Sequence, residues 1–473
     1  MTKALLVVPP FLKHATGPLL GPAMLAGAAM RAGHDARVVD LNALWIARDV
    51  GAARWSPNAF VGDHERDERL LQHSQQRFHA VTHDAARRLR AAPDALVALR
   101  TDHSMVVRAA AHLGDAQGAW LANHLVHLDR PEIVGVSVLF AGQVLWALAV
   151  TRIARTLWPG TPVVWGGAHV TALAPEVARD VRYAAAADGF VAGYAERTFV
   201  DLLDAMATGR PWLRECFRAG QGHAPRAIDD GSVAPHFEMG PRPMDAPLTL
   251  PAQYTRGCVY GRCRYCTYPA IEGTYRPLEA TPSSLVVAEA ERRAARVSFK
   301  DSLLAAPLLR ELAVSIEGRV RWSACTKLSR ALDASMLRML AQNGCATLEL
   351  GLETLDERAQ RMILKRQSPA LFLDTLDAAA AAGIAVVVNY MTGFPGVDPV
   401  DEQRGLDQLA REIEQRPELT VKVEHNRFEL ERRAPLARTP PAGLRITGAW
   451  PWSSVLDWTC TRIESRRRLE VVS

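Results

Sequence analysis

The chain has 473 residues, too many for one ordinary hydrophobic core, so its length predicts two or three domains. Hydrophobic residues make up 48% and charged residues 23% of the chain, a profile that excludes an extended disordered protein. The formal charge of +5 is small for this length and gives no argument for nucleic acid as a partner.

The sequence also gives no indication of a membrane or secreted protein. No run approaches the roughly 20 apolar residues that a membrane-spanning helix needs. The apolar stretch at residues 4–8 is interrupted by Pro9 and Pro10, so we expect no signal peptide. Three of the 7 cysteines lie close together, which favours metal ligation over a disulfide framework. We therefore expect a cytoplasmic protein.

Residues 1–206 alternate between predicted strands and helices, and form the first predicted domain. The predicted strands cover residues 4–8, 36–40, 133–139, 162–165 and 188–193. The predicted helices cover residues 21–32, 144–157 and 196–206. Strands that alternate with helices in this way predict an α/β domain with a doubly wound parallel sheet.

An insertion interrupts this alternation at about residues 43–130. It is rich in His, Arg and Asp, and its sequence shows helical patterning over residues 68–92 and 109–128. We interpret it as a helical embellishment of the first domain.

The second half of the chain repeats the alternation six times. Residues 207–250 contain scattered Pro, Gly and Asp and are predicted to be a linker. The strands predicted after it cover residues 252–257, 296–301, 320–325, 346–351, 385–391 and 420–428. Six strand–helix units are too few for an eight-stranded barrel, so residues 251–436 are predicted to form a partial (β/α)6 barrel. Residues 437–473 would be a short C-terminal extension.

Three closely spaced cysteines, Cys258, Cys263 and Cys266, are the strongest local signal in the chain. Thiolates are the usual ligands of iron–sulfur clusters, and this spacing lets one loop wrap around a cluster. Without a fourth nearby cysteine, one iron would keep an open position where a ligand can bind and react, as at catalytic zinc sites. A structural zinc site completed by Cys325, Cys345 or a histidine is the alternative.

Residues 256–266 resemble the cluster loop of radical S-adenosylmethionine (SAM) enzymes, with the aromatic Tyr265 directly before the last cysteine. The first two cysteines are one residue further apart than in the commonest family pattern, a spacing that occurs in parts of the superfamily. The resemblance implies that the three cysteines hold a [4Fe–4S] cluster. It also places Tyr265 beside SAM.

Later segments are similar to this family in the expected order. Gly351 and Glu353 belong to a Gly-Leu-Glu segment, and residues 393–396 form a Gly-Phe-Pro-Gly segment. The resemblance implies that Gly351 and Glu353 bind SAM, and a similar segment at the end of the second barrel strand adds Asp301. Glu349, Tyr390 and Glu424 are further strand-end residues expected to face the cavity, but no general acid or base is identified.

The first domain carries a second pattern at its strand ends. Ser137 and Leu139 end one predicted strand, and the pair Gly166-Gly167 ends the next. Parallel sheets bind ligands at these ends, and glycine lets a backbone approach a flat ligand closely. The pattern resembles the cobalamin-binding fold, which implies that these four residues and Gly193 hold cobalamin. A generic nucleotide-binding or flavodoxin-like domain is the alternative.

The lower axial cobalt ligand is less well defined by the sequence. In some cobalamin proteins it is the histidine of an Asp-x-His-x-x-Gly loop, and His14 occupies that position here. Leu12 replaces the aspartate that would orient the imidazole.

Together, these resemblances extend over residues 5–436 and are those of a cobalamin-dependent radical SAM enzyme. They imply a methyltransferase that moves a methyl group from methylcobalamin to an unactivated carbon of a small-molecule or peptide intermediate. Its partners would be that substrate and a reductant such as flavodoxin or ferredoxin. A radical SAM enzyme that catalyses a rearrangement, cyclisation or oxidation, and a non-catalytic corrinoid- or metal-binding module, are the alternatives.

Overall fold

The computed structural model describes residues 1–10, 17–50, 80, 84, 102–229, 231–240, 247–463 and 469–472. His14 and most of the predicted helix at 68–92 lie outside these residues. The chain divides into two compact units. The first contains Met1–Pro57, Glu65–Ala246 and Trp450–Ser454, and the second contains Asn58–His64, Pro247–Ala449 and Val455–Ser473.

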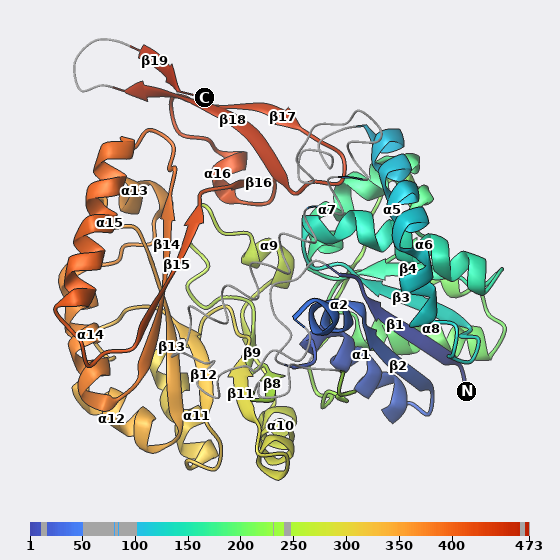
Figure 1. The fold of residues 1–473 in the computed structure, drawn as a ribbon, viewed down its shortest axis with the longest axis horizontal. Coiled ribbons are helices and arrows are strands. Elements are labelled where there is room, and N and C mark those ends of the chain that lie inside the picture. Colours follow the sequence, from blue (N-terminus) through green and yellow to red (C-terminus); the bar gives the residue numbers. More distant parts are fainter. Residues whose placement is uncertain are drawn as a thin grey trace. The chain divides into compact units, whose positions relative to one another are not determined.

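The first unit is built on a five-stranded parallel sheet with the order β2-β1-β3-β4-β5 (Figure 1). Its strands are β1 (Lys3–Val8), β2 (Asp35–Asp40), β3 (Ile133–Ser137), β4 (Val163–Gly166) and β5 (Gly189–Phe190). This is the predicted doubly wound α/β fold. Because the chain reverses its direction of winding between β1 and β3, the ligand crevice of such a sheet lies outside the carboxyl ends of these two strands.

Helices follow the strands as the alternating pattern predicts. They are α1 (Leu20–Arg31), α2 (Leu41–Val50), α5 (His103–Asn123), α6 (Val144–Leu157), α7 (Ala168–Arg179) and α8 (Glu196–Ala207). Helices α1 and α8 pack together and cover β1 through Ala4 and Leu6. Helix α5, which belongs to the predicted insertion, packs on α6. The stretch predicted as a linker contains β7 (Arg226–Ala227), which pairs with β6 (Ala192–Gly193).

The segment Trp450–Ser454 is part of the first unit although it comes from the far end of the chain. Trp452 is 2% exposed, and its ring lies edge-on to Tyr183 at 4.5 Å and to His103 at 5.4 Å between centroids. Its backbone is also held, because Tyr183 Oη accepts its N–H at 3.3 Å and its carbonyl lies 3.0 Å from Nε2 of His169. This aromatic contact was not foreseen from the sequence.

The second unit contains a six-stranded parallel sheet with the order β15-β14-β13-β12-β11-β8. Its strands are β8 (Thr249–Ala252), β11 (Arg296–Phe299), β12 (Trp322–Thr326), β13 (Cys345–Glu353), β14 (Ala385–Thr392) and β15 (Val421–Arg427). The main helices between them are α10 (Ala280–Arg292), α11 (Ala306–Ile316), α12 (Ala334–Gln342), α13 (Glu357–Ile363), α14 (Pro369–Ala382) and α15 (Pro399–Glu414). This is the predicted partial barrel.

The first barrel strand was predicted in the wrong place. The strand at residues 252–257 is replaced by β8, which ends at Ala252, and by the short β9 (Thr255–Arg256). The parallel ladder stops because the Asp301 carboxylate accepts the backbone N–H groups of Tyr254 and Thr255. Strand β9 pairs instead with β10 (Arg276–Pro277) in antiparallel orientation.

The C-terminal extension and the end of the predicted barrel region form an antiparallel sheet that the sequence did not predict. It consists of β16 (Leu430–Glu431), β17 (Leu444–Ala449), β18 (Val455–Ile463) and β19 (Leu469–Val472). The short helix α16 (Pro435–Arg438) precedes β17.

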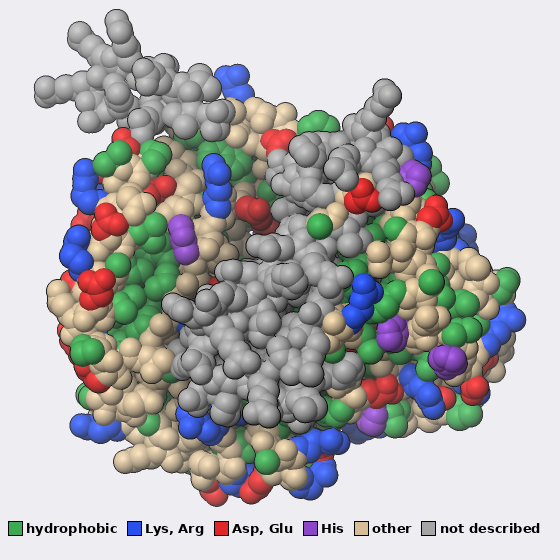
Figure 2. Space-filling model, viewed as in Figure 1, with side chains coloured by type: hydrophobic (Ala, Val, Ile, Leu, Met, Phe, Trp, Pro, Cys, Tyr) green, Lys and Arg blue, Asp and Glu red, His purple; other side chains and the backbone are tan. Residues whose placement is uncertain are grey.

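The surface gives little information about partners. In Figure 2, acidic and basic side chains are interspersed over the described part of the visible face. Among the described residues, none of the helices has the length and apolarity required to cross a membrane.

The buried Trp452 provides a test of the first unit. Replacing a buried Trp with Ala costs about 3–5 kcal/mol. We therefore expect Trp452→Ala to lower the stability of the first unit by that amount, and Trp450→Ala, at a side chain that is 39% exposed, to have a much smaller effect. Denaturation monitored by the hydrogen exchange of amides in α5 and α7 would measure both losses of stability. Equal losses in the two variants would contradict the packing described.

Candidate functional site

The three clustered cysteines lie in one loop between β9 and the short helix α9 (Tyr268–Glu272). All three are free thiols; Cys263 is buried, and Cys258 and Cys266 are partly buried. The backbone N–H of Gly261 points to Sγ of Cys258 at 3.5 Å, and the N–H of Cys266 donates to the carbonyl of Cys263 at 3.3 Å. Two hydrogen bonds within the loop, one of them to a sulfur atom, therefore help to fix its conformation.

The loop begins at a glycine that no other residue can replace without strain. Gly257 has φ +74°, and a Cβ atom there would lie 2.8 Å from the carbonyl oxygen of Gly273 and from the amide of Tyr275. Its own N–H donates to Glu272 at 3.0 Å. The chain can therefore turn from β9 into the cysteine loop while remaining against the segment that leads to β10.

Two contacts fix the far side of the loop to the end of α13. The N–H of Arg264 donates to the carbonyl of Ile363 at 2.9 Å, and the Tyr260 hydroxyl donates to the carbonyl of Leu364. The carbonyl of Arg264 accepts the N–H of Leu436 from α16 at 2.7 Å. These bonds hold the cysteine loop in place without any contribution from a metal.

The sulfur atoms are close enough to influence one another electrostatically. Burial raises the pKa of Cys266 to about 12, and the charges of Cys263 and Cys258 add to this shift. Burial likewise raises the pKa of Cys263 to about 11, opposed by the nearby charge of Lys365. Three thiolates in such a place need a positive group to compensate their charge.

Within the described ranges, no three His, Cys, Asp or Glu side chains, the loop cysteines included, lie together around a position for one metal ion. The two cysteines considered as a fourth zinc ligand lie on barrel strands. Cys345 is buried on β13, with its Sγ 3.9 Å from the carbonyl oxygen of Thr347. Cys325 on β12 is partly buried, and burial raises its pKa far above the usual range for a thiol.

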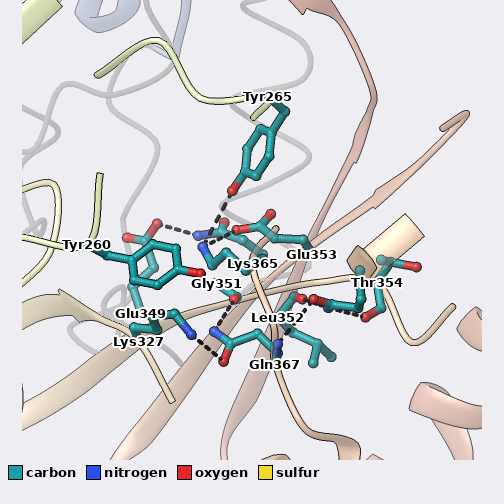
Figure 3. Close-up of polar contacts among 12 residues, drawn as sticks. Tyr260, Tyr265, Lys327, Glu349, Gly351, Leu352, Glu353, Thr354, Lys365 and Gln367 are labelled. Atoms are coloured by element: carbon teal, nitrogen blue, oxygen red, sulfur yellow. Dashed lines mark hydrogen bonds and ion pairs between the residues drawn. The ribbon is translucent and has the colours of Figure 1, made fainter. Parts of the chain in front are cut away.

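Beside the cysteine loop lies a buried ion pair (Figure 3). Lys365 Nζ is 2.7 Å from Oε1 of Glu353, with side-chain exposures of 14% and 8%. The same ammonium donates to the hydroxyl of Tyr265 at 3.4 Å. Two residues predicted to contact SAM, Glu353 and Tyr265, are thus brought together by a lysine that the sequence analysis did not single out.

The backbone at this point departs from the regular strand. Register shifts between Gly351 and Glu353, and Glu353 has φ +68°. A Cβ atom at Gly351 would lie 2.4 Å from Nζ of Lys365. The missing side chain of Gly351 therefore leaves the space that the Lys365 ammonium occupies.

A second lysine lies near the same loop. Lys327, directly after β12, donates to Oε1 of Gln367 at 3.2 Å, and its ammonium lies 4.8 Å from the ring centroid of Tyr260. Gln367 in turn donates to the carbonyl of Gly351 at 2.9 Å. Figure 3 shows how these contacts join the cysteine loop, β12 and the end of β13.

The other predicted barrel residues have structural partners. Asp301 is 4% exposed, and its carboxylate is used by the backbone of Tyr254 and Thr255, as described above. Burial raises its pKa to about 7 despite these bonds. Tyr390 does not face a cavity as expected, since it is 1% exposed and its hydroxyl accepts the N–H of Leu355 at 3.3 Å.

The two remaining strand-end carboxylates both have partners. Glu349 accepts a hydrogen bond from Asn389 at 2.7 Å, and Glu424 pairs with Lys422 at 2.7 Å. Neither has the isolated, buried setting of a general acid.

In the first unit, the predicted cobalamin residues meet at the carboxyl edge of the sheet. Ser137 pairs with Gly166, and Val138 continues the contact by donating to the carbonyl of Gly166 at 2.8 Å. Gly167 has φ +103°, and a Cβ atom there would lie 2.5 Å from the carbonyl oxygen of Val138. Only glycine fits this position.

Thr171 connects this edge to Gly193. Its hydroxyl donates to the carbonyl of Gly167 at 2.9 Å and accepts the N–H of Gly193 at 2.9 Å. Gly193 has φ +93° and lies against the carbonyl of Ala227, 2.3 Å from where a Cβ atom would be. Ser137, Leu139, Gly166, Gly167 and Gly193 thus belong to one edge, with Thr171 as the link.

Comparison with known proteins places these features in two families of domains. Residues 253–409 match the radical SAM superfamily, and residues 121–203 match the B12 binding domain. A curated protein of Pyrococcus horikoshii, "Uncharacterized methyltransferase PH0819", is 24% identical over 285 residues, which cover 56% of this chain and 61% of that protein. The chain thus matches less than two thirds of the length of this relative.

Two solved structures share the fold over nearly the whole chain. The radical SAM methyltransferase TsrM from Kitasatospora setae, solved with cobalamin and a [4Fe–4S] cluster, has a TM-score of 0.60 and 16% identity, covering 95% of this chain and 78% of that one. The cobalamin-dependent SAM radical enzyme OxsB, solved with aqua-cobalamin and SAM, has a TM-score of 0.58 and 14% identity, covering 93% and 60%.

The buried ion pair beside the cysteine loop provides one test. Removing one partner of a buried pair costs about 3–5 kcal/mol, because the other charge is left without compensation. We expect Lys365→Met to destabilise the second unit by that amount. Arg361→Met, which removes a partner of Glu357 with both side chains largely exposed, should cost no more than about 0.5 kcal/mol. Chemical denaturation would contradict the account if the two variants were equally stable.

The glycine pair provides another test. Gly167→Ala and Gly209→Ala both place a side chain at positive φ, +103° and +68°, but an added Cβ atom at Gly209 has nothing within 4 Å. We expect Gly209→Ala to cost about 1–2 kcal/mol from backbone strain alone and Gly167→Ala to cost clearly more. Thermal denaturation of both variants measures the difference, and a smaller loss for Gly167→Ala would show that the edge is looser than described.

The B12-binding match falls on the first parallel sheet, and the radical SAM match falls on the second. The chain therefore carries a B12-binding domain followed along the sequence by a radical SAM domain.

Proposed function

We propose that this protein is a cobalamin-dependent radical SAM methyltransferase that modifies an unactivated carbon of a small-molecule or peptide substrate. The observation that carries the proposal is the cysteine loop, which has three free thiols within nine residues directly after β9. The B12-binding domain in the same chain supports the choice of methyl transfer. The name of the Pyrococcus relative and the TsrM structure support it further.

Each cofactor has a proposed place on this chain. Cys258, Cys263 and Cys266 would hold the [4Fe–4S] cluster. SAM would lie beside Tyr265, Asp301, Gly351 and Glu353, and cobalamin at the edge formed by Ser137, Leu139, Gly166, Gly167 and Gly193. His14 remains a proposed axial ligand of cobalt. We also propose the domain division into residues 1–206, 207–250, 251–436 and 437–473.

When bound, the reduced cluster supplies the electron that cleaves SAM, and cobalamin supplies the methyl group. The protein's own residues bind and orient these groups. Lys365 offsets the negative charge of the thiolates and fixes the Glu353 carboxylate and the Tyr265 hydroxyl in one place. The turn at Gly257 and the backbone bonds of Arg264 hold the cysteine loop against neighbouring segments of the barrel.

Electrons would come from a flavodoxin or ferredoxin, as in the family that the sequence resembles. The alternative is a radical SAM enzyme that rearranges, cyclises or oxidises its substrate without adding a methyl group. OxsB, named only as a radical enzyme, shares the same fold, so the fold alone does not separate the two reactions.

The proposal predicts that anaerobic reconstitution with iron, sulfide and cobalamin gives a protein that cleaves SAM after reduction. With substrate, the product should gain about 14 Da and carry the label of methyl-labelled SAM, the mark of methyl transfer. The C258A/C263A/C266A variant should lose bound iron and SAM cleavage together. The matched C216A/C345A/C460A variant, which removes three thiols outside the loop, should keep its iron. A triple-loop variant that retains full activity would refute the proposal, and a product without added mass would favour the alternative reaction.

A further inference from the structure

The first unit contains a buried side chain that joins the ends of β1 and β3. These are the two strands between which the winding of the sheet reverses, and ligands of such sheets bind outside their carboxyl ends. Pro9 follows β1, and Leu139 and Phe140 follow β3. A contact that fixes the segment after β1 to the segment after β3 therefore also affects the place where such sheets bind their ligands.

Gln143 makes this connection. Its side chain is 0% exposed, and its Nε2 donates to the carbonyl of Pro9 at 2.8 Å. Its Oε1 accepts the N–H groups of Leu139 at 2.8 Å and of Phe140 at 3.3 Å. Both ends of the amide therefore have partners, and those partners lie on segments more than a hundred residues apart in the sequence. A buried amide with both ends bonded fixes its surroundings more firmly than any apolar side chain could.

The segment that Gln143 holds ends in an unusual side chain. Phe140 is 64% exposed, although Val136 and Val138, shortly before it in the sequence, are buried. This exposed aromatic side chain comes shortly after β3, at the carboxyl end where doubly wound sheets bind their ligands. It follows Leu139, a residue already proposed to contact cobalamin, and the glycine pair lies on the adjacent strand.

Cobalamin is a fitting occupant for this surface. Its corrin ring and its nucleotide base both present flat apolar faces, and aromatic side chains commonly line the sites of such ligands. The bonds from Gln143 fix the backbone of Leu139 and Phe140 relative to Pro9, so the Phe140 side chain leaves the chain from a fixed point after β3.

We propose that Phe140 is a contact residue for cobalamin and that Gln143 is the positioning residue that presents it. The inference rests on the proposed function, because it assumes that the crevice takes cobalamin. It adds two residues to those that the sequence indicated, and assigns to Gln143 a role that acts through Phe140.

Titration of the full-length apoprotein with hydroxocobalamin, followed by visible absorbance and calorimetry, tests this proposal. We expect Phe140→Ala and Gln143→Leu each to weaken binding roughly tenfold, the change that loss of one good contact produces. Because Gln143 acts through Phe140, the double variant should bind no more weakly than the weaker single variant. Phe140→Tyr, which keeps the ring, should bind like the unmodified protein.

Val181 provides the matched control. It is also an exposed apolar residue of the first unit, at 67%, but it follows α7 and not a strand of the crevice, so Val181→Ala should leave the affinity unchanged. Circular dichroism and melting curves of each variant report folding separately from binding. If Gln143→Leu does not fold, Phe140→Ala and Phe140→Tyr still decide whether Phe140 contacts cobalamin.

The outcomes are distinct. If the unmodified protein does not bind hydroxocobalamin, the proposed function itself fails. If it binds and Phe140→Ala binds equally well, the inference is overturned while the proposed function stands. If the two substitutions weaken binding independently, so that their effects multiply in the double variant, Gln143 does not act through Phe140 and the positioning role is refuted.

Discussion

The architecture of the second unit depends on where its first strand stops. The Asp301 carboxylate accepts the N–H groups of Tyr254 and Thr255, which therefore do not join the parallel ladder. The chain then turns at Gly257 into the cysteine loop. A carboxylate that the sequence suggested as a SAM ligand thus binds the backbone at the point where the parallel ladder ends, shortly before the cysteine loop.

Much of the fold could be predicted because alternating patterns are strong signals. The two parallel sheets follow from strands and helices in regular succession, and most predicted strands overlap those in the structure. The first barrel strand was misplaced, since nothing in residues 252–257 indicates that Asp301, 46 residues after Thr255, binds the backbone there. The antiparallel C-terminal sheet and the burial of Trp452 were missed for the same reason, because both depend on contacts between distant segments.

The candidate site shows the same division between local and distant information. The cysteines, Gly351 and the glycine pair were recognisable because each belongs to a short motif with a definite spacing. The structural roles of Lys365, Gln143 and Thr171 could not be predicted, because each depends on side-chain bonds to other segments of the chain. Lysine and glutamine are common surface residues, and only their burial in the structure marks these two as part of a site.

The central claim is that the three thiols hold a cluster with one iron open to SAM. Electron paramagnetic resonance of the anaerobically reconstituted, reduced protein tests it most directly. The account predicts the signal of a reduced [4Fe–4S] cluster with about four irons per chain, and a clear change in that signal when SAM is added. A protein that takes up only zinc, or a cluster signal that SAM leaves unchanged, would contradict it.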